Sequence, residues 1–177
     1  MNVLIVVDMQ NDFVSGALGT PEAREIVPRV VDRVEEGIRR GEKILFTRDT
    51  HETDYLNTQE GKKLPVPHCI MNSAGWQLYG KTGQALDRSR DMVVCKPTFP
   101  SLWLGNWLKE RGYDRIELVG LVSYMCVLSN AIVAKAALPE AELVVDASCT
   151  TGADQRLHSN ALELMETLQI TVVNREV

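Results

Sequence analysis

The sequence lacks several features that would assign it to well-known classes of protein. No apolar run among its 177 residues approaches the length of about eighteen that a membrane span requires, so we expect a soluble protein without a membrane partner. Lys and Arg form no cluster and the net charge is -5, which argues against binding to nucleic acid. The N-terminus has no basic region before its short apolar run, unlike an export signal, so we expect a cytoplasmic location. Small molecules are therefore the expected ligands.

The four cysteines are too far apart to form a recognisable cysteine motif. Cys69, Cys95, Cys126 and Cys149 include no C-x-x-C pair, so neither a disulfide framework nor a zinc knuckle is indicated. We expect free thiols. A lone Cys in an apolar segment is usually a small buried hydrophobic residue, and this is our interpretation of Cys95 and Cys149.

Six short runs rich in β-branched residues recur along the chain, and most are separated by segments with helical periodicity. They are "NVLIVV", "KILFT", "DMVVC", "RIELVG", "AELVVDA" and "ITVVN". This alternation predicts an α/β fold: a three-layer α/β/α sandwich with a doubly wound, mainly parallel six-stranded sheet. The length of 177 residues suits one domain spanning residues 1–177.

Capping residues and apolar stripes predict four main helices. Residues 21–40 follow Thr20 as a cap, begin with Pro21 and end before Gly41. The other three helices are expected at residues 101–111, 123–137 and 154–168. Residues 123–137 are apolar nearly all round, so this helix should be the most buried. The long segment of residues 50–90 has little strand character, but its Trp, Cys, Ile and prolines predict an ordered, packed loop.

Three functional side chains follow predicted strands. Asp8 follows "VLIVV", Lys96 follows "MVVC", and Cys126 lies six residues beyond Gly120, where a helical pattern begins. Parallel strands would bring them to one edge of the sheet, where ligands bind in such folds. A helix N-terminus and a neighbouring ammonium favour the thiolate, so we expect a low pKa for Cys126. Asp8 could accept the thiol proton and return it to a departing amine.

Each of these signals is weak when taken alone. An acidic residue after the first strand often caps a loop or binds magnesium, and a Lys after a strand is often merely solvated. The convergence of three such groups at one sheet edge favours a hydrolytic Cys, Asp and Lys triad.

The same residues carry a family resemblance that spans the chain in order. "VVDMQNDF", "TRDTH", "PVPHC", "CKPTF" and "GLVSYMCV" resemble the successive motifs of the isochorismatase-like cysteine hydrolases, especially the nicotinamidase branch. The resemblance maps Asp8, Lys96 and Cys126 onto the catalytic residues of that family. It also implies a cis peptide bond at Leu121–Val122, which turns the N–H groups of Val122 and Cys126 toward one point as an oxyanion hole.

Asp49, His51 and His68 form a second group of candidate residues. A D-x-H pair followed by a distant His offers ligands suited to zinc, manganese or iron, with positions left for water or a substrate ring nitrogen. The resemblance implies one such divalent metal and no organic cofactor. Several nicotinamidases have another His soon after the D-x-H, where this chain has "ETDY". The alternative is that His51 and His68 only fix the loop, and His158 in the final helix is expected to be a surface residue.

The substrate pocket departs from the nicotinamidase pattern. That branch often has an aromatic residue before P-x-H-C, whereas "KKLPVPHC" has Leu64 and Pro65. Phe13, Phe99 and Trp103 could replace it as apolar walls around a planar substrate, and the alternative for Trp103 is a place in the core.

The favoured function is a cysteine amidohydrolase that cleaves a small carboxamide, nicotinamide or a related amide, to a carboxylate and ammonia through a Cys126 thioester. A carbamoyl or ureido compound is an alternative substrate, and a catalytically silent metabolite-binding module is an alternative from another class. A thiol redox protein is disfavoured because no second Cys lies near Cys126. The resemblance also implies a homo-oligomer, a dimer or tetramer.

Overall fold

A computed structural model describes residues 1–84 and 91–175, and these form a parallel sheet covered by helices on both faces. In the described residues the sheet has six strands in the order β3-β2-β1-β4-β5-β6, and every pairing is parallel. The strands are β1 (Asn2–Val7), β2 (Lys43–Asp49), β3 (Met92–Lys96), β4 (Arg115–Leu121), β5 (Glu142–Thr151) and β6 (Thr171–Val173). The doubly wound three-layer sandwich predicted from the sequence is confirmed.

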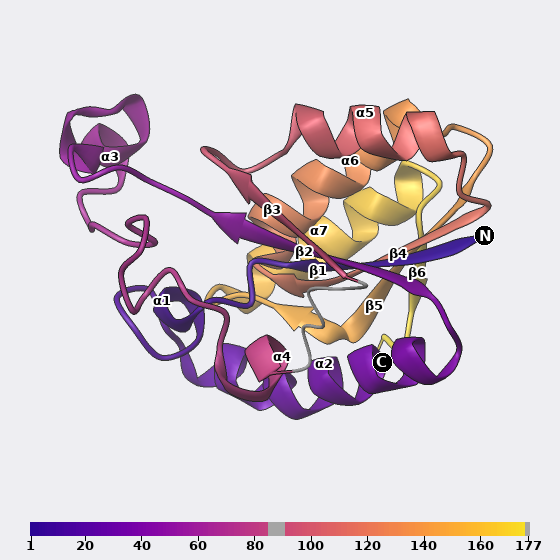
Figure 1. The fold of residues 1–177 in the computed structure, drawn as a ribbon, viewed down its shortest axis with the longest axis horizontal. Helices are drawn as coiled ribbons and strands as arrows, with labels where there is room; N and C mark the ends of the chain where they lie inside the picture. The colour runs from indigo at the N-terminus through magenta and orange to yellow at the C-terminus, as the bar shows by residue number, and fades with distance from the viewer. Residues whose placement is uncertain (85–90, 176–177) are drawn as a thin grey trace.

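Helices cover the two faces of this sheet unequally. The main ones are α2 (Pro21–Arg39), α5 (Leu102–Arg111), α6 (Leu128–Ala137) and α7 (Gln155–Thr167). Helix α2 covers one face together with the short α4 (Gly80–Gln84), and α5, α6 and α7 cover the other (Figure 1). The short α1 (Asn11–Val14) connects β1 to α2.

Strand β1 explains why the sheet must be covered on both sides. Leu4 and Val6 point into the core under α2, whereas Val3, Ile5 and Val7 point into the core under the other helices. Continuous apolar runs of this kind are typical of central strands in parallel sheets, because neither face meets water. The two cores therefore fix the register of β1 between β2 and β4.

The predicted helix ends agree with the structure because they depend on local capping. The Thr20 side chain accepts a hydrogen bond from the Ala23 N–H at 3.0 Å, and Pro21 is the first residue of α2. Ser101 and Asp154 cap α5 and α7 in the same way. Gly112 ends α5 in the left-handed conformation, with φ of 67°.

The helix predicted at residues 123–137 is divided in the structure. Residues Ser123–Val127 form a π-helical turn, η2, and α6 follows it. The prediction that this helix is the most buried is only partly right, because Met125 and Ile132 are exposed. Strand β5 also runs four residues beyond the predicted run and reaches Thr151, which brings its end beside η2.

Residues 50–84 of the long segment pack as an ordered loop, as predicted, while residues 85–90 lie outside the described residues. The segment contains the short helices η1 (Tyr55–Asn57) and α3 (Gln59–Lys63). Tyr55 is buried and its hydroxyl donates to the Leu64 carbonyl at 2.9 Å. Across both described ranges, no helix is long and apolar enough to cross a membrane.

Candidate active site

The carboxyl ends of the central strands bring together Asp8, Lys96 and Cys126. The Lys96 Nζ lies 2.6 Å from the Asp8 Oδ2 and 3.5 Å from the Cys126 Sγ. Asp8 follows β1 and Cys126 follows β4, which are neighbours where the strand order reverses, the usual ligand position in doubly wound sheets. Lys96 ends β3 and lies on the far side of β2 from Asp8 in the strand order. All three side chains are buried, with Cys126 only 5% exposed.

Thr47 of β2 fixes the Asp8 carboxylate. Its hydroxyl donates to the Asp8 Oδ1 at 2.6 Å, and its oxygen accepts from the Asp8 N–H at 3.1 Å. Asp8 itself has a left-handed backbone with φ of 47°, a conformation that Asp tolerates better than most residues. The pair of hydrogen bonds leaves the Asp8 Oδ2 directed at the ammonium.

The buried charges shift the acidities of all three groups. Burial raises the pKa of Asp8, and the Lys96 ammonium opposes that rise. Burial disfavours the Lys96 ammonium, but Asp8, Cys126 and Asp49 outweigh this effect and raise the pKa of Lys96. Burial also raises the pKa of the Cys126 thiol well above its ordinary value, and the Asp8 carboxylate raises it further.

The expectation of a low pKa for Cys126 is therefore wrong. The helix start and the ammonium both favour the thiolate, but removal of the sulfur from water and the nearby carboxylate have the larger effect. At neutral pH the resting form is a thiol beside an ammonium. The raised pKa of Asp8 makes its carboxylate a better proton acceptor than an ordinary aspartate.

The turn that carries Cys126 has an unusual backbone. The Leu121–Val122 peptide bond is cis, as the resemblance implied. Gly120 has φ of 110°, and a Cβ at this position would collide with the backbone of Val7 in β1. Only glycine allows β4 to lie this close to β1 at the point where the turn begins. Cys126 lies within the π-helical turn η2 and immediately precedes Val127, the N-cap of α6.

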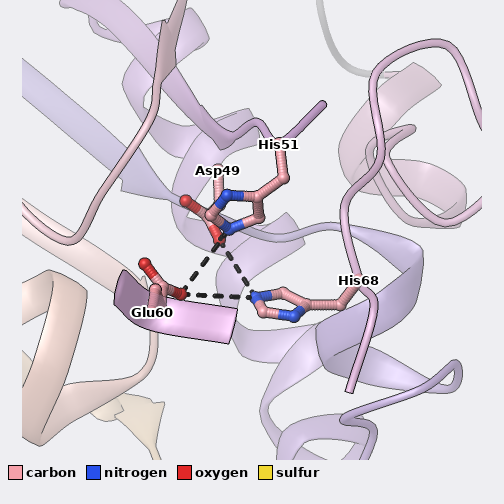
Figure 2. Close-up of side chains that lie close together, drawn as sticks. All are labelled: Asp49, His51, Glu60 and His68. Carbon is pink, nitrogen blue, oxygen red and sulfur yellow. Dashed lines mark hydrogen bonds and ion pairs between the residues drawn. The ribbon is translucent and has the colours of Figure 1, made fainter. Parts of the chain in front are cut away.

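A second group of polar side chains lies beside the Cys, Asp and Lys triad. Asp49, His51, Glu60 and His68 direct one ligand atom each toward a common point, and these atoms all lie within 4.8 Å of one another (Figure 2). The Asp49 Oδ2 lies 3.0 Å from the His51 Nε2 and 3.4 Å from the His68 Nε2. The His68 Nδ1 lies 2.8 Å from the Val66 carbonyl oxygen, so it donates a proton there, and the Nε2 faces the carboxylates of the group.

Glu60 is the member of this group that was not predicted from the sequence. It lies in α3, and its Oε1 is 3.6 Å from the His51 Nε2 and 3.8 Å from the His68 Nε2. Two carboxylates and two imidazoles form a donor set suited to a divalent metal such as zinc or manganese. The signal in the sequence was Thr58, whose side chain caps α3 and so predicts a helix start two residues before Glu60.

Asp49 connects the two groups, and Gln10 holds Asp49 in place. The Asp49 Oδ1 lies 3.6 Å from the Lys96 Nζ, while its Oδ2 faces the two histidines. Lys96 and the histidines lower the pKa of Asp49 despite its burial. The buried Gln10 side chain donates to the Asp49 carbonyl at 2.9 Å and accepts from the Asp49 N–H at 2.7 Å. Neither Gln10 nor Thr47 was predicted from the sequence.

A cavity of about 210 Å³ joins the two groups. Cys126 and Val122 line it together with Asp49, Glu60 and His68. Its other walls are mostly apolar: Phe13, Leu18, Thr20, Ala23, Leu64, Phe99, Leu121, Tyr124, Met125, Gly152 and Ala153. A ligand in this cavity therefore meets the sulfur, the metal-ligand group and an apolar surface at once.

The structure corrects three expectations about side chains near the site. Trp103 does not line the cavity and is not a core residue: it is 50% exposed and stacks on Trp107 at 6.2 Å. Cys95 is exposed, because alternate residues of the edge strand β3 face outward, whereas Cys149 is buried as expected. His158 is half-buried rather than a surface residue, and its Nδ1 lies 2.9 Å from the Ser123 Oγ.

The fold and the site define a class: a doubly wound α/β protein with Cys, Asp and Lys at the switch point of the sheet, beside an Asp/His/Glu group. The chain belongs to the isochorismatase domain family, whose model matches residues 2–177. The family resemblance predicted from the motifs is confirmed.

Nicotinamidases and pyrazinamidases are similar to this chain over nearly its whole length. The nicotinamidase of Saccharomyces cerevisiae is 25% identical over 224 aligned residues, which cover 99% of this chain and 100% of that protein. The pyrazinamidase/nicotinamidase structure from Streptococcus mutans has a TM-score of 0.85 at 26% identity, covering 98% of this chain and 100% of that one. The pyrazinamidase of Pyrococcus horikoshii, solved in complex with zinc, has a TM-score of 0.82 at 27% identity, covering 98% and 99%.

Proposed function

We propose that this protein is a cysteine amidohydrolase that cleaves a small carboxamide to a carboxylate and ammonia through a thioester on Cys126. One observation carries the proposal: Cys126 lines a cavity, and its sulfur lies 3.5 Å from an ammonium that is 2.6 Å from a carboxylate. The nicotinamidase and pyrazinamidase relatives support hydrolysis of a C–N bond.

Asp8 acts as the base and then as the acid. It takes the proton of the Cys126 thiol as the sulfur attacks the amide carbonyl carbon, and the charge moves to the carbonyl oxygen. The N–H groups of Val122 and Cys126 stabilise that oxygen. When the C–N bond breaks, Asp8 returns the proton to the nitrogen, and ammonia leaves. Lys96 stays protonated throughout, because its raised pKa keeps it an ammonium, and it stabilises the thiolate and the Asp8 carboxylate.

Water completes the reaction. A water molecule that gives its proton to Asp8 attacks the thioester carbon, the C–S bond breaks, and the sulfur leaves as thiolate. The proton on Asp8 returns to the sulfur. The product forms as the carboxylic acid and releases its remaining proton to solvent to become the carboxylate, with a thiol and a carboxylate restored on the enzyme.

Asp49, His51, Glu60 and His68 would hold one divalent metal, zinc, manganese or iron, and no organic cofactor is proposed. The donor set fits such an ion, since all four ligand atoms approach one point and the His68 Nδ1 is engaged elsewhere. A bound ion supplies a Lewis-acid position for a water molecule or a ring nitrogen of the substrate. The zinc in the Pyrococcus horikoshii pyrazinamidase supports zinc as the first ion to test.

Nicotinamide or a related planar amide is the proposed substrate class. Phe13, Leu64 and Phe99 present apolar walls to the cavity, and the metal-ligand group gives a ring nitrogen a position away from the reacting amide. Phe13 also packs on the His68 ring, with the ring centroids 5.5 Å apart.

Ammonia release from a panel of small amides tests this proposal. The panel contains nicotinamide, pyrazinamide, a carbamoyl amine and a ureido acid, each with and without added zinc. Turnover of the ring amides would support the proposal. After acid quenching, the Cys126 peptide should also be heavier by the mass of the acyl group. Ammonia release that persists in Cys126→Ala would overturn the mechanism, and turnover of the ureido acid alone would replace the substrate class.

We also propose a cytoplasmic homo-oligomer, a dimer or tetramer, that works without nucleic acid or membrane partners. The exposed apolar side chains Leu102 and Trp103 of α5, Met125 of η2 and Ile132 of α6 support self-association, because α5 packs against α6 and exposed apolar surface often marks a protein interface. Sedimentation equilibrium tests this proposal directly, and a monomer at micromolar concentration would contradict it.

A further inference from the structure

The turn that carries Cys126 is held from outside by the end of β5 and the start of α7. Its N-cap, Val122, makes no side-chain capping hydrogen bond. The first N–H groups of a helical turn have no partner within it, so such a turn depends on neighbouring groups for its orientation. The Thr150 hydroxyl donates to the Gly120 carbonyl at 2.7 Å, just before the turn begins.

His158 provides the contact to the turn itself. Its Nδ1 lies 2.9 Å from the Oγ of Ser123, the first residue of η2, and Ser123 is wholly buried. A buried hydroxyl needs a hydrogen-bond partner, and the imidazole is the one side-chain partner that the described residues give it. Ser123 and Cys126 belong to the same five-residue π-helical turn, so a hydrogen bond that holds Ser123 constrains the backbone segment that carries Cys126.

His158 also borders a second cavity behind the turn. This polar cavity of about 340 Å³ is lined by α2, the end of β5 and α7, with Arg29, Gln155 and Arg175 among its residues. Cys126 does not line it, so the imidazole lies between the back of the turn and a surface that does not belong to the substrate cavity. The histidine is therefore placed to support the turn without touching the substrate.

We propose that His158 is a positioning residue whose hydrogen bond to Ser123 fixes the orientation of Cys126 and of the N–H groups in its turn. The proposal rests on the role proposed above for Cys126. Burial, with the positive charge of Arg175, lowers the pKa of His158, so the ring is neutral at neutral pH. A neutral imidazole can donate to or accept from the hydroxyl, according to its tautomer.

Two substitutions separate the hydrogen bond from packing. His158→Leu keeps most of the volume without a hydrogen bond, and it should lower kcat about tenfold with KM changed less than about twofold. His158→Asn places an amide near the position of the Nδ1, and it should keep at least about half of the wild-type kcat. His158→Gln carries the amide one carbon further and should behave as His158→Leu does. Asn160→Leu is the matched control, an exposed residue on the same helix, and it should leave kcat unchanged.

A double-mutant cycle sharpens the test. In the Ser123→Ala background the hydroxyl is gone, so adding His158→Leu should lower kcat by less than about a further twofold. Additive losses, equal losses in His158→Leu and His158→Asn, or a wild-type kcat in His158→Leu with a lowered Tm would each overturn the proposal.

Alkylation of Cys126 by iodoacetamide, followed by mass spectrometry of its peptide, makes the test independent of substrate. If the protein released ammonia from none of the amides, the proposed function would fail. The alkylation rate would still decide the role of His158. We expect this rate to fall at least about threefold in His158→Leu and to remain at the wild-type value in His158→Asn. Identical rates in the two variants would overturn the proposal.

Discussion

The two ends of the parallel sheet bury charged groups in opposite ways. At the amino end, Glu117 of β4 accepts from the Arg33 Nε at 2.6 Å and from the Arg115 guanidinium at 3.1 Å. The Arg33 guanidinium also donates to Glu42 at 2.8 Å. Each carboxylate there faces at least one guanidinium. At the carboxyl end, the single ammonium of Lys96 faces Asp8 and Asp49 together.

The pKa shifts of Glu117 and Asp8 reflect this difference. Burial alone would raise the pKa of Glu117, but Arg33 and Arg115 lower it below its usual value. The pKa of Asp8 is raised instead, because one ammonium shared with Asp49 does not offset burial. Matched charges are stable in one protonation state, whereas the carboxyl end has groups whose protons can move. We therefore expect substitutions at the amino end to change stability and those at the carboxyl end to change chemistry.

Cys126→Ala should have the largest effect. With no nucleophile, turnover of any amide substrate should fall by about 10⁴-fold or more, while Tm stays close to the wild-type value because the side chain is small. Cys95→Ala is the matched control, an exposed thiol beside Lys96 that should leave turnover unchanged. Ammonia release and thermal unfolding measure the two effects. A large fall in Tm with Cys126→Ala would place this residue with the stabilising groups instead.

Asp8→Asn should have the second largest effect on turnover. It should change turnover and the reactivity of the Cys126 sulfur toward iodoacetamide in opposite directions. Loss of the proton carrier should lower kcat about 10³-fold. The Asp8 carboxylate raises the pKa of Cys126, so its removal should lower that pKa and speed alkylation of the sulfur by iodoacetamide. Lys96→Met is the counterpart: loss of the ammonium should raise the pKa of Cys126 further and slow alkylation. Alkylation that slows together with turnover in Asp8→Asn would instead show that the carboxylate promotes ionisation of the Cys126 thiol and does not raise its pKa.

Local signals explain how much of the fold was predictable. Strands, caps and helix ends depend on residues close in sequence, such as Thr20 with Ala23, and these predictions were confirmed. Three residues of the candidate site could be grouped because parallel strands deliver their carboxyl ends to one edge. The position of each of these residues after a predicted strand is visible in the sequence, without knowledge of any contact.

The remainder depends on the path of the chain through space. Glu60 reaches the histidines only because the loop folds back through α3, and no spacing rule gives that path. The pKa of Cys126 depends on its burial and its neighbours, which a helix start does not reveal. His158 belongs to an amphipathic helix, and only the extension of β5 and the packing of α7 show that it faces Ser123.

Glu60→Gln tests whether Glu60 is one of the metal ligands at the carboxyl end of the sheet. Loss of one carboxylate should weaken zinc binding by about 10- to 100-fold, since the ion loses a charged ligand. Calorimetric titration of the metal-stripped protein with zinc measures the change directly. Glu52→Gln is the control, an exposed acidic residue near His51 that is not among the four ligands. Equal affinities in the two variants would remove Glu60 from the ligand set.

Glu117→Gln should have a smaller effect of a different kind. Gln keeps the shape but loses the charge that Arg33 and Arg115 face, so the free energy of unfolding should fall by about 2 kcal/mol near neutral pH, with kcat changed less than about twofold. The folded-state pKa of Glu117 is lowered, so its stabilising contribution is complete above its unfolded pKa of about 4.5 and is lost as the pH falls through the lower folded value. The difference between wild type and variant, measured by urea unfolding, should therefore shrink as the pH falls below about 4.5. If the free energy of unfolding differed by the same amount at all pH values, the ionised Glu117 would not be the source of the stabilisation. The contrast between the two ends of the sheet would then rest on the carboxyl end alone.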